Sequence, residues 1–586
     1  MYLTSKEFSR NSKYNPNNFS NKRRVFPLQR TCLIEKMDWD SSDNESEFEG
    51  FTAEDIEGTE IPDAGSDISV SPVSTPPTSD NESDSDEDTW SRNLRKPNVR
   101  DFNDRFGATF TLEDNQQEKD FFNKFFPREL IEKITTETNN YATKCIEEKP
   151  DPKWKPTNVT EILAFIGLHV VMSVIQLPSY TLCWKQMWPY TISGIPQVMQ
   201  RERFERLCKY FHCNDTSNNP PRRTPGHDKL CHVKPVLDAV SKTCLDNYKP
   251  PKEQTIDEGM IAFKGRLSFK QYLPAKPTKF GIKVWKRASP YNGYCHEFQV
   301  YTGKKEGQGR EDNLGSRVVK DLTRKITDKG HHVYMDNFFS NPTLFEELAK
   351  ETIYCCGTAR GNRKGMPETL KNAKLKNRGE LITMQKGNLC AWVWKDKKNV
   401  FYLSTNCDPT TANTVRRRQK DGTLKDVPCP SVATAYNKFM FGVDRADQIR
   451  MQYSTCRKAL KWWKYLFWFC FDLALVNSYI CMKESPNHKL LSKSGKEKVR
   501  KQLSFRIALG QQLIGTYRGS RKRKLVSVVD NCGNAHWPTK FEKKGRCKLC
   551  YQNKRRREVK LGCKQCDIYL CVDDDCFAKY HSQLLQ

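Results

Sequence analysis

Residues 333–339 read Val333-Tyr334-Met335-Asp336-Asn337-Phe338-Phe339, an apolar run that ends directly in an acid. Such a run is typical of a buried strand, and an acid at its end would emerge at the edge of a sheet. A second apolar run ends in the same way at Thr255-Ile256-Asp257-Glu258-Gly259. Together these stretches predict a sheet that carries carboxylates where two of its strands end.

A third acidic motif lies far downstream, in the helix-like stretch Gly442-Val443-Asp444-Arg445-Ala446-Asp447-Gln448. Asp444 and Asp447 are three residues apart and therefore share one helix face, so either or both could supply a third carboxylate. Mg²⁺ prefers oxygen ligands. Two such ions about 4 Å apart stabilise the attacking and leaving oxygens of a phosphodiester. Because a single acid at a strand end most often caps a turn, the prediction of a two-Mg²⁺ site rests on the whole set.

The charge of the chain predicts a polyanionic partner. The 586 residues include 98 Lys+Arg and 70 Asp+Glu, for a net charge of +28. Nucleic acid is the usual partner of so basic a protein, and the length indicates several domains.

The charge is also segregated along the chain. Residues 37–91 hold 18 acids and no Lys or Arg, so we expect a disordered acidic tail, and the start at Met1 or Met37 stays open. An acid follows three positions after each of four serines, a pattern typical of acidophilic-kinase sites; a solubilising tail explains the same composition. These serines are Ser42, Ser79, Ser83 and Ser85.

Several protein classes are disfavoured by what the sequence lacks. It has no run of about 18 apolar residues, so we expect no membrane span. Its densest apolar stretch, residues 465–480, is interrupted by Asp472 and Asn477 and is predicted to be a buried helix. No apolar signal-peptide core opens the chain. The 23 Cys are therefore expected to be reduced thiols or metal ligands and not a disulfide framework.

Changes in hydrophobic periodicity predict an α+β multidomain protein. Helical spacing dominates before the first acidic motif, short strand-like runs follow, and helical spacing returns around Asp444. Within residues 361–430, residues 390–394 and 400–403 are predicted to pair as strands. The predicted parts are a disordered tail 1–97 (acidic over 37–90), a helical part 98–250, an α/β core 251–360, a β-rich insertion 361–430, a core helix 431–450, a second helical part 451–517, a basic linker 518–530 and a Cys-rich domain 531–586.

The C-terminal Cys and His residues predict a structural metal module. Two Cys-x₂-Cys pairs at this spacing are a strong zinc signal, since each pair offers two thiolates to one tetrahedral ion. Six Cys and two His are enough for two Zn²⁺, and which ligands share an ion is not readable from the spacing. The candidate ligands are His536, Cys547, Cys550, Cys563, Cys566, Cys571, Cys576 and His581.

Basic side chains cluster where DNA would have to pass. One group follows Asp257 directly, and another lies within the Cys-rich domain; a solvated basic face explains either group equally well. The candidate DNA-binding residues are Lys264, Arg266, Lys276, Lys279, Lys283, Arg555, Arg556 and Arg557. Arg521-Lys522-Arg523-Lys524 is a candidate nuclear localisation signal or a DNA-contacting linker.

These motifs together resemble the piggyBac transposases and their domesticated derivatives. The resemblance spans about residues 100–584. It is carried by the acidic motifs, by Phe263-Lys264-Gly265-Arg266, by Tyr272-Leu273-Pro274-Ala275-Lys276-Pro277, by Tyr436-Asn437 and by the terminal Cys/His cluster.

The resemblance implies an RNase H-like core with catalytic acids Asp257, Asp336 and Asp444, with Asp447 as a supporting fourth. It also implies that the helical parts form one dimerisation and DNA-binding domain, and that the zinc domain is cross-braced. The implied reaction is cut-and-paste transposition in the nucleus by a homodimer: nicking at the transposon end, hairpin formation, and strand transfer into a TTAA target.

Other interpretations stay open from sequence alone. A domesticated descendant would keep DNA binding without transposition. An RNase H-like nuclease would cut DNA without joining it. A zinc-module protein of chromatin-reader or ubiquitin-ligase type would leave most of the chain unexplained, and the basic residues of the module argue against it.

Overall fold

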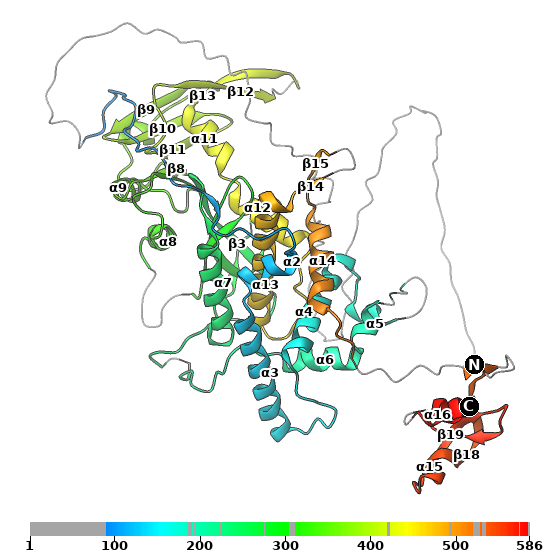
Figure 1. The fold of residues 1–586 in the computed structure, drawn as a ribbon. Helices are drawn as coiled ribbons and strands as arrows, with labels where there is room; N and C mark the ends of the chain where they lie inside the picture. The colour runs from blue at the N-terminus through cyan, green and yellow to red at the C-terminus, as the bar shows by residue number, and fades with distance from the viewer. Residues whose placement is uncertain are drawn as a thin grey trace, which may run out of the picture. The chain divides into compact units, whose positions relative to one another are not determined.

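The computed structural model describes residues 89–185, 190, 192, 194–222, 224–274, 276–303, 311–418, 422–491, 495–519, 528–529, 535–572 and 575–583 (Figure 1). The predicted acidic segment up to residue 88, with its four serines, and the basic stretch at residues 521–524 lie outside these described residues.

A nine-stranded mixed sheet forms the centre of the fold. Strand β5 pairs antiparallel with β3 on one side and with β6 and β4 on the other, and β7 and β8 follow β3 in parallel. All five residues of β7 are buried, as expected of a central parallel strand. The strands are β3 (Glu253–Ala262), β4 (Gln271–Tyr272), β5 (Phe280–Ala288), β6 (Cys295–Val300), β7 (His331–Met335) and β8 (Ile353–Ala359).

The segment predicted as a β insertion is rich in strands but is not a separate unit. Strands β9 (Leu381–Lys386), β10 (Leu389–Lys395) and β11 (Asn399–Ser404) continue the central sheet, because β11 pairs with the otherwise open edge of β8. The predicted pairing of residues 390–394 with 400–403 is confirmed by the β10–β11 register. The last two strands of this segment, β12 (Ala412–Arg418) and β13 (Leu424–Pro430), form a two-stranded ribbon apart from the central sheet.

The helices that precede the central sheet in the sequence and the helices that follow it share one hydrophobic core. The helix α13 packs against α2 and α7, and α14 packs against α4 (Figure 1). At the α4–α14 crossing a Cβ on Gly167 would lie 3.0 Å from the Gly510 carbonyl oxygen, so close packing there requires glycine. The helices are α2 (Glu118–Phe125), α3 (Arg128–Glu148), α4 (Val159–Ile175), α6 (Arg201–Tyr210), α7 (Lys234–Asp246), α13 (Trp463–Glu484) and α14 (Gln502–Ile514).

Helix α13 is the buried helix that the sequence predicts. It is long and apolar enough to cross a membrane by length and composition, but 94% of its most apolar window is buried inside the protein. Asp472, at its middle, is fully buried and lies 3.6 Å from the buried guanidinium of Arg506. The aromatic residues of this helix pack in the core.

The prediction that the disordered tail extends to residue 97 is wrong, because the described residues after 88 are bound to the sheet. The Trp90 indole N–H donates to the Gly365 carbonyl at 3.1 Å, and Ser91 forms an antiparallel bridge with Gln385 of β9. The Asn98 N–H donates to the Asn388 side-chain carbonyl at 2.9 Å. Backbone hydrogen bonds to a sheet edge order a segment that composition alone marks as polar coil.

Shorter elements flank the central sheet and build the C-terminal module. Helices α8 (Leu314–Thr323) and α9 (Pro342–Lys350) flank β7, and α11 (Ser431–Phe439) leads into α12 (Gly442–Gln452). The C-terminal module contains β17 (Ala535–His536), β18 (Pro538–Arg546), α15 (Lys548–Gln552), β19 (Glu558–Cys563), β20 (Ile568–Tyr569) and α16 (Cys576–Gln583).

Candidate functional site

The parallel register of β3 and β7 brings two of the predicted acids together. Ile256 pairs with Met335 as the last residue pair of this ladder, so Asp257 and Asp336 are the next residues on neighbouring strands. Neighbouring strands lie about 4.8 Å apart. A carboxylate oxygen of each lies within 4.8 Å of the other and of a Glu258 oxygen. The structure therefore forms a three-carboxylate group at the end of β7.

Glu258 is a member of this group to which the sequence reasoning assigned no role. Residues 257 and 258 would point to opposite faces of a regular strand, which hid the signal of two adjacent acids. Beyond the end of β7, β3 is paired on its β5 side alone. The Glu258 N–H donates to Asp257 Oδ1 at 2.7 Å, which holds the Asp257 carboxylate against the backbone of Glu258.

The third predicted acid, Asp444, lies outside this 4.8 Å group but on the helix that covers it. A Cβ on Gly442 would lie 2.6 Å from Thr255 Oγ1, and one on Gly259 would lie 2.7 Å from Asp447 Oδ2. Thr255, Asp257 and Gly259 share one face of β3. Because α12 follows this face from residue 255 to residue 259, Asp444 comes between its two contact points along the helix, and its charge acts with that of Asp257 to raise the pKa of Lys276.

Burial and mutual repulsion make this group unfavourable for negative charge. Burial raises the pKa of Asp257 to about 7, with Glu258 and Asp336 adding to the rise. Burial, with the Glu258 charge next, also raises the pKa of Asp336. A divalent cation bound here would relieve both effects, and carboxylates are the donors that Mg²⁺ prefers. The donor set therefore fits a hard divalent metal.

Two of the predicted DNA-binding lysines are directed at these acids. Lys276 Nζ lies 3.8 Å from Asp257 Oδ2 and 3.9 Å from Glu258 Oε1, and Lys283 Nζ lies 3.5 Å from Glu258 Oε2. Burial alone would lower the pKa of Lys276, but Asp257, Glu258, Asp444 and Asp336 together raise it. The other predicted DNA-binding residues near β3 are exposed: Lys264, Arg266 and Lys279.

Two arginines that the sequence reasoning missed lie on the turn after Asp336. Arg363 Nη2 donates to the carbonyls of Asn337 at 2.7 Å and Phe338 at 2.8 Å. Arg360 Nε donates to Asn337 Oδ1 at 3.4 Å, and its side chain is exposed. Only the folded loop after β8 brings these cations to the acidic edge, so their position in the chain carried no signal.

Asp447 is engaged by cations and is not a member of the three-carboxylate group. Its Oδ1 lies 2.5 Å from Lys286 Nζ and 3.1 Å from Arg450 Nη2. Burial opposes its ionisation, but the two cations outweigh burial and hold the pKa of Asp447 below its ordinary value.

All eight predicted ligands of the C-terminal module gather into two groups of four. In the first group, Cys550 Sγ lies 3.5 Å from both Cys571 Sγ and Cys576 Sγ, and Cys547 is the fourth member. The Cys571 N–H donates to Cys547 Sγ at 3.2 Å. Burial would raise the pKa of Cys547, but backbone N–H groups outweigh it and lower the pKa, which favours the thiolate that binds metal.

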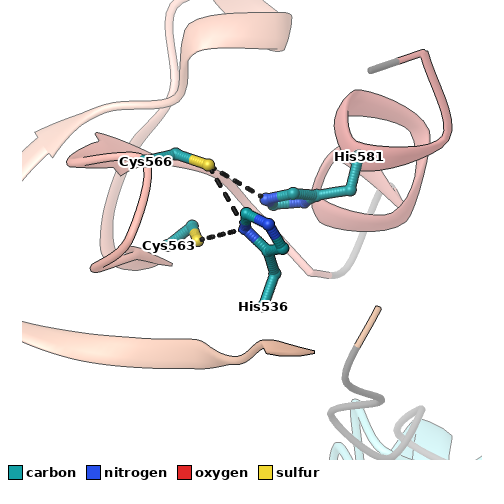
Figure 2. Close-up of side chains that lie close together, drawn as sticks. All are labelled: His536, Cys563, Cys566 and His581. Atoms are coloured by element: carbon teal, nitrogen blue, oxygen red, sulfur yellow. Dashed lines mark hydrogen bonds between the residues drawn. The ribbon is translucent and has the colours of Figure 1, made fainter. Parts of the chain in front are cut away.

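The second group combines two thiols with two imidazoles (Figure 2). His536 Nδ1 lies 3.4 Å from Cys563 Sγ and 3.3 Å from Cys566 Sγ, and His581 Nε2 lies 3.5 Å from Cys566 Sγ. His581 Nδ1 lies 2.7 Å from the Phe577 carbonyl. A proton on Nδ1 donated to that carbonyl leaves Nε2 free to bind a metal.

The two groups interleave along the chain, which answers the pairing that the sequence left open. Along the chain, His536 comes before all four cysteines of the first group and His581 comes after them. The Cys563–Cys566 pair comes between the first two and the last two of those cysteines. This is the cross-braced arrangement. Closed four-ligand shells of Cys and His suit a structural ion. The predicted DNA-binding residues Arg555 and Arg556 of this module are exposed, and Arg557 is half-buried.

Comparison with known proteins shows the family and the fold of this chain. Residues 117–479 match the family model described as Transposase IS4. The chain belongs to the piggyBac transposase family. This piggyBac-type chain is 28% identical over 414 residues to human piggyBac transposable element-derived protein 5, covering 68% of this chain and 76% of that protein. It is 27% identical over 479 residues to human piggyBac transposable element-derived protein 3, covering 78% and 75%.

A solved piggyBac structure has the same fold. The cryo-EM structure of the piggyBac transposase synaptic complex with hairpin DNA matches with a TM-score of 0.61 and 24% identity, covering 81% of this chain and 100% of that chain.

Proposed function

We propose that this protein is a DDD-type DNA transposase that moves an element by a cut-and-paste reaction at TTAA sites. Its core would be RNase H-like: three antiparallel strands, β6, β5 and β3, are followed by β7 and β8 in parallel on the other side of β3. The observation that carries the proposal is the register that makes Asp257 and Asp336 neighbours beneath the helix of Asp444.

The three acids would hold two Mg²⁺ ions, with Glu258 beside them. Bound there, the ions would supply charge stabilisation to the attacking and leaving oxygens of the phosphodiester. In the first step a water oxygen forms the new P–O bond and the old bond breaks, leaving a 3′-OH. That hydroxyl attacks a phosphodiester of the opposite strand, which forms a hairpin and releases the flanking DNA with a free 3′-OH. Water then cleaves the hairpin to restore the 3′-OH, which attacks a target phosphodiester and displaces a 3′-oxygen of the target strand.

Basic side chains of the site have distinct tasks in this scheme. Lys276 and Lys283 offset the negative charge of the acids when DNA approaches, since both ammonium groups face carboxylates. Arg360 and Arg363 hold the turn after Asp336 and present positive charge where the DNA backbone must pass. Phosphate contacts of this kind position DNA without reading its sequence.

The C-terminal module would bind two structural Zn²⁺ ions and contact transposon-end DNA through Arg555, Arg556 and Arg557. We further propose that the protein acts as a homodimer in the nucleus and that kinases modify its acidic tail. The net charge of +28 supports a nucleic-acid partner.

In vitro cleavage tests the proposal directly. Purified full-length protein is incubated with Mg²⁺ and DNA ends taken from the TTAA-flanked borders of its own element. Hairpin and joined products are expected for the wild type and are expected to vanish in Asp336→Asn. Sequence-specific binding without any products would instead favour the second candidate, a domesticated nuclear DNA-binding protein. The descriptions of the human relatives as element-derived proteins keep that candidate in view.

A further inference from the structure

Asp447, the fourth acid of the site, is paired with the ammonium group of Lys286. Lys286 is 1% exposed, so its ammonium is removed from water, and Asp447 Oδ1 lies 2.5 Å from it. A buried ammonium requires a carboxylate nearby, because an uncompensated charge in the interior is strongly destabilising. Arg450, also buried, binds the same oxygen at 3.1 Å.

This ion pair lies at a place where the backbone is shaped for it. A Cβ on Gly259 would lie 2.6 Å from Lys286 Nζ and 2.7 Å from Asp447 Oδ2. Gly259 is two residues beyond Asp257 on the same face of β3. The pair therefore fills the space beside the first catalytic acid that any side chain at residue 259 would occupy.

The same pair fixes α12 at a second point. At the start of the helix, Gly442 fits against Thr255, and the Arg445 guanidinium donates to the Tyr291 carbonyl. One turn further on, Asp447 holds the helix to Lys286 of β5. Asp444 lies between these two attachments. Its distance from Asp257 is therefore set by both.

We infer that Asp447 is a positioning residue and not a metal ligand: paired with Lys286, it sets α12 so that Asp444 completes the site with Asp257 and Asp336. The inference rests on the proposed function and assigns a role within it. It separates two acids that the sequence alone left interchangeable.

Removal of both charges distinguishes positioning from ligation. A buried ion pair replaced by apolar residues of similar size is often neutral for stability, whereas removal of one partner is not. We compare Asp447→Leu, Lys286→Met and the double variant with Asp336→Asn as the ligand control. Each is studied as the full chain in metal-depleted buffer without a strong chelator, so that the C-terminal module keeps its ions.

Mn²⁺ affinity, measured by electron paramagnetic resonance of the free ion, is the readout that separates the two roles. The double variant is expected to bind Mn²⁺ within about threefold of the wild type, while Asp336→Asn loses at least about tenfold. Asp447→Leu alone is expected to lower the Tm and to reduce DNA cleavage by about a hundredfold, because a misplaced Asp444 disturbs the reacting geometry. The double variant is expected to recover at least about tenfold of that loss.

Three results would overturn the inference. Mn²⁺ affinity of the double variant as low as that of Asp336→Asn would make Asp447 a ligand. A double variant no better than Asp447→Leu in Tm and cleavage would show that the two residues do not act as a pair. A wild type that neither binds Mn²⁺ nor cleaves would refute the proposed function and this inference with it. If Asp447→Leu does not fold, the double variant alone decides, because it leaves no uncompensated Lys286.

Discussion

Replacement of Asp257 by Asn is expected to stabilise the metal-free protein, although it should abolish activity. Burial and neighbouring acids raise the pKa of Asp257 from 3.8 to about 7. Between about pH 4 and pH 7, the folded state therefore keeps a proton on Asp257 that the unfolded state has released. In that window the stability of the wild type falls as pH rises. Above pH 7, Asp257 is ionised in both states, and the full free-energy cost of burying its charge remains.

The size of the effect follows from the shift. About 3 pKa units at 1.36 kcal/mol each give about 4 kcal/mol as an upper estimate at pH 8. Asn carries no charge, and its side-chain oxygen can still accept the 2.7 Å hydrogen bond from the Glu258 N–H. We therefore expect Asp257→Asn to raise the free energy of unfolding by about 2–4 kcal/mol at pH 8 and by close to zero at pH 4.

Denaturant unfolding at a series of pH values, followed by tryptophan fluorescence, measures this difference. The buffers are metal-depleted without a strong chelator. Asp238→Asn serves as the control, since its side chain is 63% exposed and its surface pair with Lys234 contributes at most about 0.5 kcal/mol. Mg²⁺ at about 100 times its Kd should remove most of this difference, because it stabilises the wild type by about 2.7 kcal/mol. An Asp257→Asn variant less stable than the wild type at pH 8 without metal would refute the reasoning.

Three further perturbations have defined outcomes. Lys276→Met removes an ammonium 3.8 Å from Asp257, so Mn²⁺ affinity is expected to rise about five- to tenfold while DNA cleavage falls. Lys279→Met, at an exposed lysine, is the control. A lower Mn²⁺ affinity in Lys276→Met would contradict the proposed charge balance. Cys566→Ser should lose both zinc equivalents in elemental analysis of the purified protein, because the two ligand groups interleave; retention of one full equivalent would mean that the sites form independently. Asp472→Asn leaves the fully buried Arg506 without its counter-ion and should cost about 3 kcal/mol of stability in denaturant unfolding; an unchanged unfolding midpoint would show that the pair is not coupled.

The acidic motifs were predictable because an apolar strand that ends in an acid is a local pattern. The adjacency of Asp257 and Asp336 depends on the parallel register of β3 and β7, which joins residues 79 positions apart and leaves no local trace. The role of Asp447 was hidden for the same reason. Its spacing from Asp444 shows a shared helix face, but its partner Lys286 is brought to it only by the pairing of β3 with β5.

Cysteine spacing identified the ligands of the C-terminal module but could not assign them to two ions, because every Cys-x₂-Cys pair offers the same local geometry. The β-rich segment shows a related limit. Alternating residues predicted the hairpin of β10 and β11, but strand pattern does not tell which free edge a hairpin will join.

The core that α2 and α7 share with α13 has a consequence for biosynthesis. Phe122 of α2 packs against Phe471 of α13 with ring centroids 5.4 Å apart. About 200 residues separate α7 from α13, and at about 5–20 residues per second a ribosome needs roughly 10–40 s to make them. During that time the faces of α2 and α7 that pack against α13 lack this partner. We expect the nascent chain to recruit chaperones that bind exposed apolar helices until α13 is made, and slower elongation through the sheet segment to increase aggregation.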